Sequence, residues 1–184
     1  MKNLEENFLL AKKRERRAQK ALYDMFSPKM LAIANSYVNN LHDAEDILSN
    51  AFLKCFTRLD ECREWKSFPF WLRKIVVNDA VSFLRKNRNI LYADIEVADD
   101  HPDEDIDERL TEINIEEIFS QMPAGYKLIF NLYVFEDKKH HEIAEMLNIS
   151  EGTSKSQLSK AKKWLAEFLK TEQNEKRNTE TIKI

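Results

Sequence analysis

The chain has 184 residues, of which 43% are apolar and 33% are charged, and its formal net charge at pH 7 is −3. This composition is typical of a globular protein with one large or two small domains, and no apolar run approaches the roughly 18 residues that a membrane-spanning helix needs. With only two glycines and four prolines in the chain, we expect an all-α fold with short turns.

The start of the chain and the cysteines indicate the cellular compartment. Residues 1–17, MKNLEENFLLAKKRERR, lack the apolar stretch and cleavage site of a secretory signal, so we expect a cytoplasmic protein without membrane insertion. In that reducing compartment Cys55 and Cys62 should be thiols on or near a core. No CxxC pair or nearby histidine supports a metal site or a cofactor, and a redox role for the two thiols stays open.

Charge is distributed unevenly along the chain. Residues 1–89 carry 17 Lys and Arg against 11 Asp and Glu, whereas residues 90–118 carry one Arg against 12 acids. Clustered basic charge is typical of a nucleic-acid partner, and an acidic block indicates an extended linker. The predicted organisation is a helical domain at 1–89, an acidic flexible linker at 90–113, a helical domain at 114–170 and a polar tail at 171–184.

Three helices are predicted in the first domain, because apolar residues recur at helical spacing over 21–40, 43–59 and 68–89. Together they should form a small bundle. The second helix begins with several acids and the third ends in a basic cluster, and both could simply complement helix ends. The apolar stripe through Trp71 is more simply explained as core than as a base-stacking platform.

The second domain contains a predicted helix-turn-helix. Residues 122–137 form an almost continuous apolar run after Pro123, which predicts a buried helix. A short helix follows at 140–147, and Asn148 can adopt the left-handed conformation that ends a helix. Ser150 is a good N-cap for a longer, basic helix. A short helix, a tight turn and a longer helix in this order are typical of a DNA-binding motif.

The stretch SEGTSKSQLSKAKK at 150–163 holds four lysines and one acid. If Leu158 points inward, helical periodicity puts a set of small polar and basic residues on the outer face and Lys155 on its flank. That outer set is Gly152, Ser156, Ser159, Lys160 and Lys163. Small side chains allow close entry into a major groove, lysines reach phosphates or guanine edges, and Thr153 at the helix start suits a phosphate. The alternative is a solvated, lysine-rich surface helix.

Three stretches, in this order across an acidic linker, resemble the extracytoplasmic-function (ECF) sigma factors, the smallest sigma-70-type initiation subunits of bacterial RNA polymerase. DAEDILSNAFLKCF (43–56) resembles the helix that docks on the clamp coiled coil of the polymerase β′ subunit. FPFWLRKIVVNDAVSFLRK (68–86) is similar to the segment that melts and reads the −10 promoter element. Residues 122–165 are similar to the domain that reads the −35 element.

The resemblance implies three sets of functional residues. The polymerase-binding set is Asp43, Glu45, Asp46, Leu48 and Phe52. The −10 set is Trp65, Lys66, Ser67, Asn78, Arg85 and Lys86, of which Asn78 and the 61–67 loop would hold a base flipped out of the stack. The −35 set is Gly152, Thr153, Lys155, Ser156, Gln157, Ser159, Lys160 and Lys163.

The resemblance also implies partners and shows departures. Implied partners are core RNA polymerase, through its β′ clamp and β subunits, promoter DNA, and an anti-sigma factor. Ser154 occupies an inward position that usually carries an aliphatic residue, and Gln157 replaces a frequent arginine.

Two other classes of protein remain as alternatives. An independent helix-turn-helix regulator would explain residues 140–168 but not 43–89, and no dimerisation element is apparent. A helical enzyme would need a catalytic arrangement, and no Ser/His/Asp set, metal-spaced His/Cys set or glycine-rich phosphate loop can be placed. Binding to core RNA polymerase discriminates a sigma factor from both alternatives, because neither the regulator nor the enzyme should need it.

Overall fold

The structure is a computed structural model, and it describes residues 3–38, 40–87 and 115–181. Within these ranges every regular element is helical, and the chain divides into two compact units, Met1–Asn87 and Arg88–Ile184. The prediction of an all-α fold with two small helical domains is confirmed for the described residues. The predicted acidic linker at 90–113 lies outside them.

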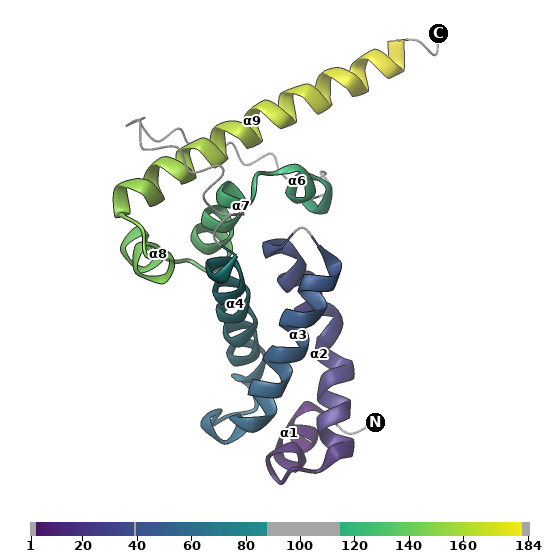
Figure 1. The fold of residues 1–184 in the computed structure, drawn as a ribbon. Helices are drawn as coiled ribbons and strands as arrows, with labels where there is room; N and C mark the ends of the chain where they lie inside the picture. The colour runs from purple at the N-terminus through teal and green to yellow at the C-terminus, as the bar shows by residue number, and fades with distance from the viewer. Residues whose placement is uncertain (1–2, 39, 88–114, 182–184) are drawn as a thin grey trace. The chain divides into compact units, whose positions relative to one another are not determined.

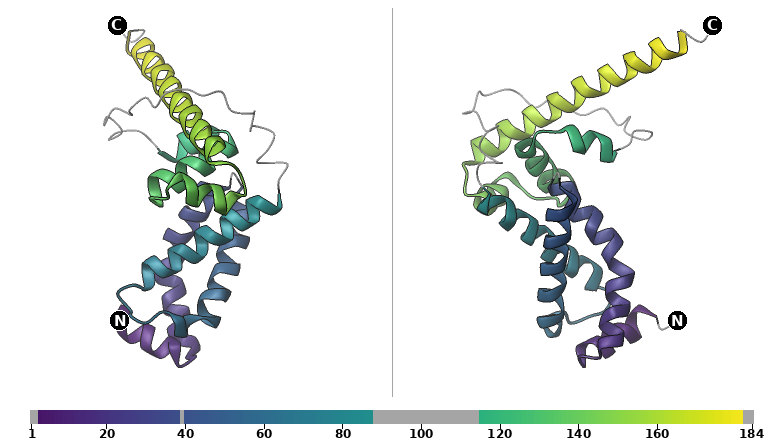
Figure 2. Two further views of the ribbon diagram at one scale, coloured as in Figure 1. Left: turned by 90° about the vertical axis from the view of Figure 1, so that its left-hand side faces the viewer. Right: turned by 45° about the vertical axis from the view of Figure 1, so that its right-hand side comes forward.

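The first unit is built from α1 (Leu4–Lys12), α2 (Arg16–Tyr37), α3 (Leu41–Thr57), the 3-10 turn η1 (Leu59–Glu61) and α4 (Phe68–Lys86). Helices α2, α3 and α4 pack against one another, and α1 packs against α2 (Figure 1). Figure 2 shows α1 at the end of this bundle that also holds the connection between η1 and α4. The helix α1 was not predicted, and α2 begins five residues earlier than expected and continues through Pro28.

Aromatic rings fill the core of this first unit close to α1. The ring of Phe68 is fully buried and meets Phe8 and Phe26 edge-on, with centroids 5.6 and 5.3 Å away. Each such edge-to-face pair stabilises a fold by roughly 0.5–1.5 kcal/mol beyond the contribution of the apolar area that it buries. They join α1 and α2 to the first residue of α4.

The two cysteines lie in the same core as free thiols, as expected for the reduced form. Burial raises the pKa of the Cys55 thiol to about 12, and the neighbouring Cys62 contributes to the increase. A thiol reacts as its thiolate, so Cys55 is not a nucleophile near neutral pH in the folded chain.

The second unit contains α6 (Ile115–Gln121), α7 (Ala124–Phe130), the π-helical segment η2 (Asn131–Phe135), α8 (His140–Leu147) and α9 (Glu151–Thr181). Helices α7 and α8 both pack on α9. The predicted buried helix at 122–137 is wrong in its second half. There the N–H of Glu136 donates to the carbonyl of Asn131, five residues back, which widens the turn. As a result, three apolar residues that were expected to be buried are exposed: Tyr133, Val134 and Phe135.

Helix α9 differs from the predicted polar tail at 171–184, since it continues as one helix to Thr181 (Figure 1). Its sequence contains no glycine after Gly152 and no proline, and it is rich in Glu, Gln, Lys and Arg, which are good helix formers. Residues 182–184 lie outside the described part of the chain.

Candidate nucleic-acid interface

The start of α3 presents the predicted acidic cluster. Asn40 caps the helix, because its side-chain oxygen accepts from the N–H of His42 at 2.9 Å. Behind this cap Glu45 and Asp46 are exposed and Asp43 is half-exposed. The three carboxylates are therefore available to a partner, and Asp43, the one of them in the first turn of α3, also favours the positive end of the helix dipole.

The apolar members of the polymerase-binding set are placed differently from the expectation. Leu48 and Phe52 are 5% and 3% exposed and belong to the core, where the Phe52 ring lies 4.7 Å from that of Tyr23. Neither side chain is available on the surface of α3 in this structure. The reason is helical periodicity: Leu48 and Phe52 lie beside the buried stripe of Ile47 and Ala51.

Sequence reasoning missed the leucines that α3 does expose. Leu41 and Leu53 are 56% and 68% exposed. Together with Glu45 and the exposed Ser49 they are spaced four residues apart, so the four side chains share one face. This four-residue spacing was the signal that could have identified them. The exposed face of α3 thus combines carboxylates with leucines at both ends.

The loop between η1 and α4 brings Trp65, Lys66 and Ser67 together. The carbonyl of Glu64 accepts from the hydroxyl of Ser67 at 2.8 Å and from its N–H at 3.1 Å, which folds the loop into a tight turn. Lys66 is exposed, and its Nζ lies 5.6 Å from the centroid of the Trp65 ring. A cation and an aromatic face presented on one loop suit the phosphate and the base of a single-stranded nucleotide.

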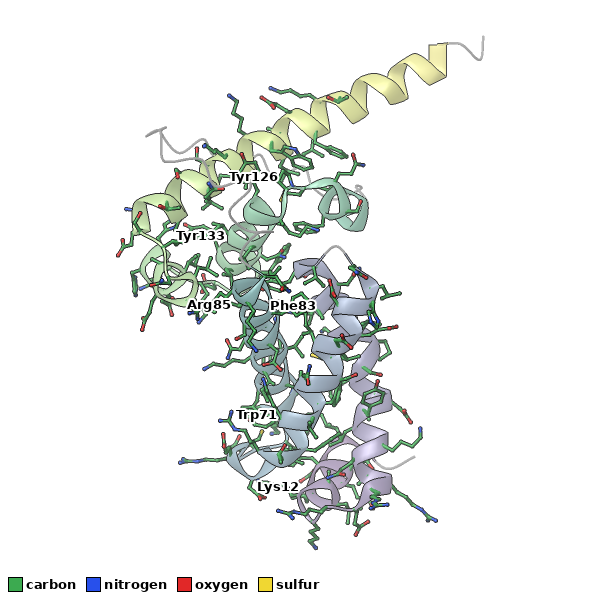
Figure 3. The ribbon with its side chains drawn as sticks, in the orientation of Figure 1. Lys12, Trp71, Phe83, Arg85, Tyr126 and Tyr133 are labelled. Atoms are coloured by element: carbon green, nitrogen blue, oxygen red, sulfur yellow. The ribbon has the colours of Figure 1, made fainter. Side chains whose placement is uncertain are left out.

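The remaining −10 residues lie farther along α4. Asn78, Arg85 and Lys86 are all exposed. At about 1.5 Å per residue, Asn78 lies roughly 15 Å along the helix from Phe68, and Arg85 roughly 25 Å. The structure therefore distributes the predicted −10 set along one helix and does not gather it at one point. Figure 3 labels Trp71 and Arg85 at two levels of α4.

The predicted helix-turn-helix is confirmed in its local geometry. Asn148 ends α8 in the left-handed conformation, at φ 55° and ψ 51°. The hydroxyl of Ser150 accepts from the N–H of Thr153 at 2.9 Å, as an N-cap does. At the start of α8 the carboxylate of Glu142 accepts from the N–H of Lys139, and this hydrogen bond lowers the pKa of Glu142.

The outer face of α9 is partly as predicted. Gly152, Lys155 and Lys163 are exposed, and Thr153, Ser159 and Lys160 are half-exposed. Two members of the −35 set are buried and are corrected here. Gln157 is 0% exposed because it flanks the buried stripe of Ser154, Leu158 and Ala161. Ser156 is also buried, and its hydroxyl turns back to donate to the carbonyl of Thr153.

A hydrogen bond joins the two helices of the motif at the inward position 154. Ser154 is fully buried, as expected, and its hydroxyl lies 2.9 Å from Nδ1 of His140, the first residue of α8. The His140 ring stacks on Tyr133 of η2, with centroids 4.9 Å apart and planes 25° apart. One turn along α9, the amide of Gln157 is buried with neither of its polar atoms hydrogen-bonded. The His140–Ser154 pair was not foreseen, because it joins residues in two different helices.

The second unit also contains a buried lysine. Lys127 of α7 is 1% exposed, and burial lowers its pKa from 10.5 to about 8. A buried ammonium loses hydration that its surroundings replace only in part.

These features define a helical protein of two units, one with a helix-turn-helix whose second helix bears lysines in its first turns and one with an acidic and leucine-bearing face. Within the described residues no helix is long and apolar enough to cross a membrane.

Comparisons with known proteins identify the family. The family described as Sigma-70 region 2 matches residues 22–90, and the family described as Sigma-70, region 4 matches residues 112–165. RNA polymerase sigma factor SigV of Bacillus subtilis is 32% identical over 131 residues, which is 71% of this chain and 78% of SigV. ECF RNA polymerase sigma factor SigW of the same organism is 24% identical over 173 residues, covering 86% of this chain and 92% of SigW.

Among solved structures, the sigma factor RpoE in a complex with the anti-sigma factor NepR from Bartonella quintana is 22% identical, with a TM-score of 0.46. The match covers 82% of this chain and 96% of that one. The chain described here belongs to the ECF sigma factors of the sigma-70 family. Proteins of this family, this chain included, are transcription initiation factors that direct RNA polymerase to promoters.

Proposed function

We propose that the chain divides promoter recognition between its two units. Residues 1–89 dock on core RNA polymerase and read and melt the −10 element, and residues 114–170 read the −35 element, with 90–113 as the connection. The observation that carries this proposal is the pairing of two surfaces in one chain: an acidic, leucine-bearing face on α3 and a capped, lysine-bearing helix start on α9. A protein that bound only DNA would have no use for the first surface.

Run-off transcription tests the proposal. Core RNA polymerase from the source organism is mixed with the full chain and a library of templates whose −35 and −10 positions are randomised. We expect transcripts from a small set of related promoters, and only when both proteins are present. Specific DNA binding by the chain alone, with no polymerase-dependent transcription, would instead identify an independent regulator.

The docking surface is proposed to be the exposed face of α3. Glu45, Asp46 and the half-exposed Asp43 would meet basic residues of the β′ clamp, and the exposed Leu41 and Leu53 would supply apolar contact. Leu48 and Phe52, which the family resemblance assigned to this surface, would support it from the core. Such a mixture of apolar contact and charge is ordinary for a protein–protein interface.

The −10 surface is proposed to follow α4. The loop with Trp65, Lys66 and Ser67 would hold an unstacked base, while Asn78 and the basic end at Arg85 and Lys86 would contact the strand farther along. Flipping a base costs a few kcal/mol, and an aromatic face with a neighbouring cation offsets such a cost.

The −35 surface is proposed to be the first turns of α9. The N-terminal half of a recognition helix contacts base edges, and later turns reach only phosphates. We assign base contact to Lys155 or Lys160 and phosphate contact to Lys163, with Gly152 allowing close approach and Thr153 and Ser159 beside them. In the described conformation Ser156 and Gln157 lie beneath this surface.

Three substitutions separate these lysine roles. Lys163→Met should weaken holoenzyme binding by a similar factor on every −35 variant and reduce the salt slope by about one unit. Lys155→Met or Lys160→Met should cost about 1–3 kcal/mol and relax the preference at one base pair. Filter binding of holoenzyme to −35 variants at several salt concentrations measures both quantities. Lys170→Met, on the exposed side of the same helix, is the control. Equal weakening of all variants by every lysine change would make α9 an electrostatic clamp and not a reader.

Three further parts of the proposal follow from the family. The chain works in the cytoplasm, where polymerase and promoter DNA are. It contributes binding and melting and has no catalytic activity of its own. An anti-sigma factor is its expected regulator.

A further inference from the structure

A single ammonium group reaches from α1 to the start of the loop that carries Trp65, Lys66 and Ser67. Lys12, the last residue of α1, donates through Nζ to the backbone carbonyl of Cys62 at 2.8 Å. The same Nζ lies 5.2 Å from the centroid of the Phe8 ring. Figure 3 labels Lys12 in α1 at the end of the first unit.

Cys62 is the C-cap of η1 and the first residue of the loop. Its position controls the residues that follow, because the loop is tied to itself by short bonds. The Cys62 thiol and the Ser67 hydroxyl both donate to the carbonyl of Glu64, at 3.5 and 2.8 Å. The N–H of Phe68 donates to the carbonyl of Trp65 at 3.2 Å. A loop folded on itself in this way moves as one piece if its first residue moves.

Helix α1 also holds the far end of the loop. Phe8, one turn before Lys12, is buried and meets the ring of Phe68, the first residue of α4, edge-on at 5.6 Å. One face of α1 therefore contacts both ends of the loop, Cys62 through an ammonium and Phe68 through a ring. The region that matches Sigma-70 region 2 begins at residue 22, so α1 lies outside it.

We propose that α1 is a clamp for the base-holding loop and that Lys12 is a positioning residue for promoter melting. This inference rests on the proposed role of the loop in holding an unstacked −10 base. Lys12 does not contact DNA in this scheme. Its charge-assisted hydrogen bond holds Trp65 and Lys66 in position before the base is unstacked. Promoter melting then does not have to include the entropic cost of ordering the loop.

The test uses the full chain with core polymerase on a promoter that the unsubstituted chain selects from the randomised library. Lys12→Met keeps the apolar stem over Phe8 but removes the donor and the charge. Lys12→Arg keeps a donor and should rescue. Lys13→Met is the matched control, because Lys13 is the exposed neighbour at the same helix end. Open complexes are measured by permanganate reactivity of unpaired thymines, with saturating holoenzyme and well below the unfolding temperature of every variant.

We expect Lys12→Met to reduce open-complex formation about tenfold, as for the loss of one charge-assisted hydrogen bond. Polymerase affinity and binding to duplex −35 DNA should not change, and Lys12→Arg and Lys13→Met should open the promoter as the unsubstituted chain does. A merely stabilising role for Lys12 would lower the melting temperature without this selective loss. Native opening by Lys12→Met would overturn the inference.

Two further variants, Trp65→Ala and Lys66→Ala, show whether a negative result concerns only the role of α1 or also the proposed role of the loop in melting. If both lose opening while Lys12→Met retains it, the loop holds the base and α1 does not position it. If both retain opening, the loop has no role in melting, and the proposed −10 surface and this inference fail together.

Discussion

Changing Asp43, Glu45 and Asp46 to lysine together is expected to abolish binding of the chain to core RNA polymerase. Glu45 and Asp46 are exposed and Asp43 is half-exposed at the capped start of α3. Reversal turns each attraction to a basic clamp surface into a repulsion, and like charges brought together at an interface cost several kcal/mol. We expect at least a hundredfold loss of affinity, measured by fluorescence anisotropy of the labelled chain titrated with core polymerase.

The fold should survive this change. Only Asp43 lies in the first turn of α3, where an acid contributes about 0.3–1 kcal/mol through the helix dipole, so α3 would lose only part of its stability. The matched control changes Glu5, Glu6 and Glu15 to lysine. These are three exposed acids of the same unit, two of them in the first turn of α1. The control gains the same charge and loses two first-turn acids against one in the α3 variant, but it should keep polymerase affinity within a few-fold. Native affinity in the α3 variant would remove this helix from the docking surface.

Lys127→Met is expected to stabilise the second unit at pH 7 by about 1–3 kcal/mol, because a pKa lowered from 10.5 to about 8 penalises the charged folded state by about 1.4 kcal/mol per unit, less the contacts that Lys127 makes and methionine loses. Lys127 is buried and its pKa is lowered to about 8 by that burial. Holding it charged at pH 7 therefore costs free energy that methionine does not. Urea unfolding followed by the fluorescence of Trp164 reports on this unit when Trp65 and Trp71 are changed to phenylalanine in every protein compared.

The stability difference between Lys127→Met and the unsubstituted chain should depend on pH, in a direction set by the lowered pKa of Lys127. Between about pH 8 and 10.5 the unfolded chain keeps a proton on Lys127 that the folded chain has lost, so native stability rises with pH in that window. The advantage of the methionine variant should be largest below pH 8 and should shrink toward pH 10.5. Lys170→Met, at an exposed site in the same unit, should show no such trend. A constant difference across the window would mean that burial of the Lys127 charge is not its source.

The sequence predicted best those structural features that depend on only a few neighbouring residues. The left-handed end at Asn148 and the cap at Ser150 depend on local backbone chemistry, and both are found. The inward position of Ser154 follows from periodicity alone. The partner of Ser154 could not be predicted, because His140 lies in another helix and only tertiary packing brings the two together.

Only some of the residues that the family resemblance assigned to surfaces are exposed in the structure, for a geometric reason. A motif identifies which helix forms a surface, but the face that each residue occupies depends on how the helix packs. Leu48 and Phe52 turn toward the core, while Leu53, one residue on, is exposed. The π-helical turn at Asn131–Phe135 changes the face again, since its wider turn breaks the periodicity from which the buried run was predicted.

The pair of Ser154 and His140 restricts how this domain can evolve. Removing His140 leaves the fully buried Ser154 hydroxyl unsatisfied, at a cost of about 1–3 kcal/mol, whereas replacing both residues by apolar groups can be almost neutral. A lineage that changes His140 while it keeps the buried serine at 154 therefore passes through a less stable ancestor unless position 154 changes with it. The two sites are expected to mutate as a coupled pair, and their joint state should mark separate branches of a family tree.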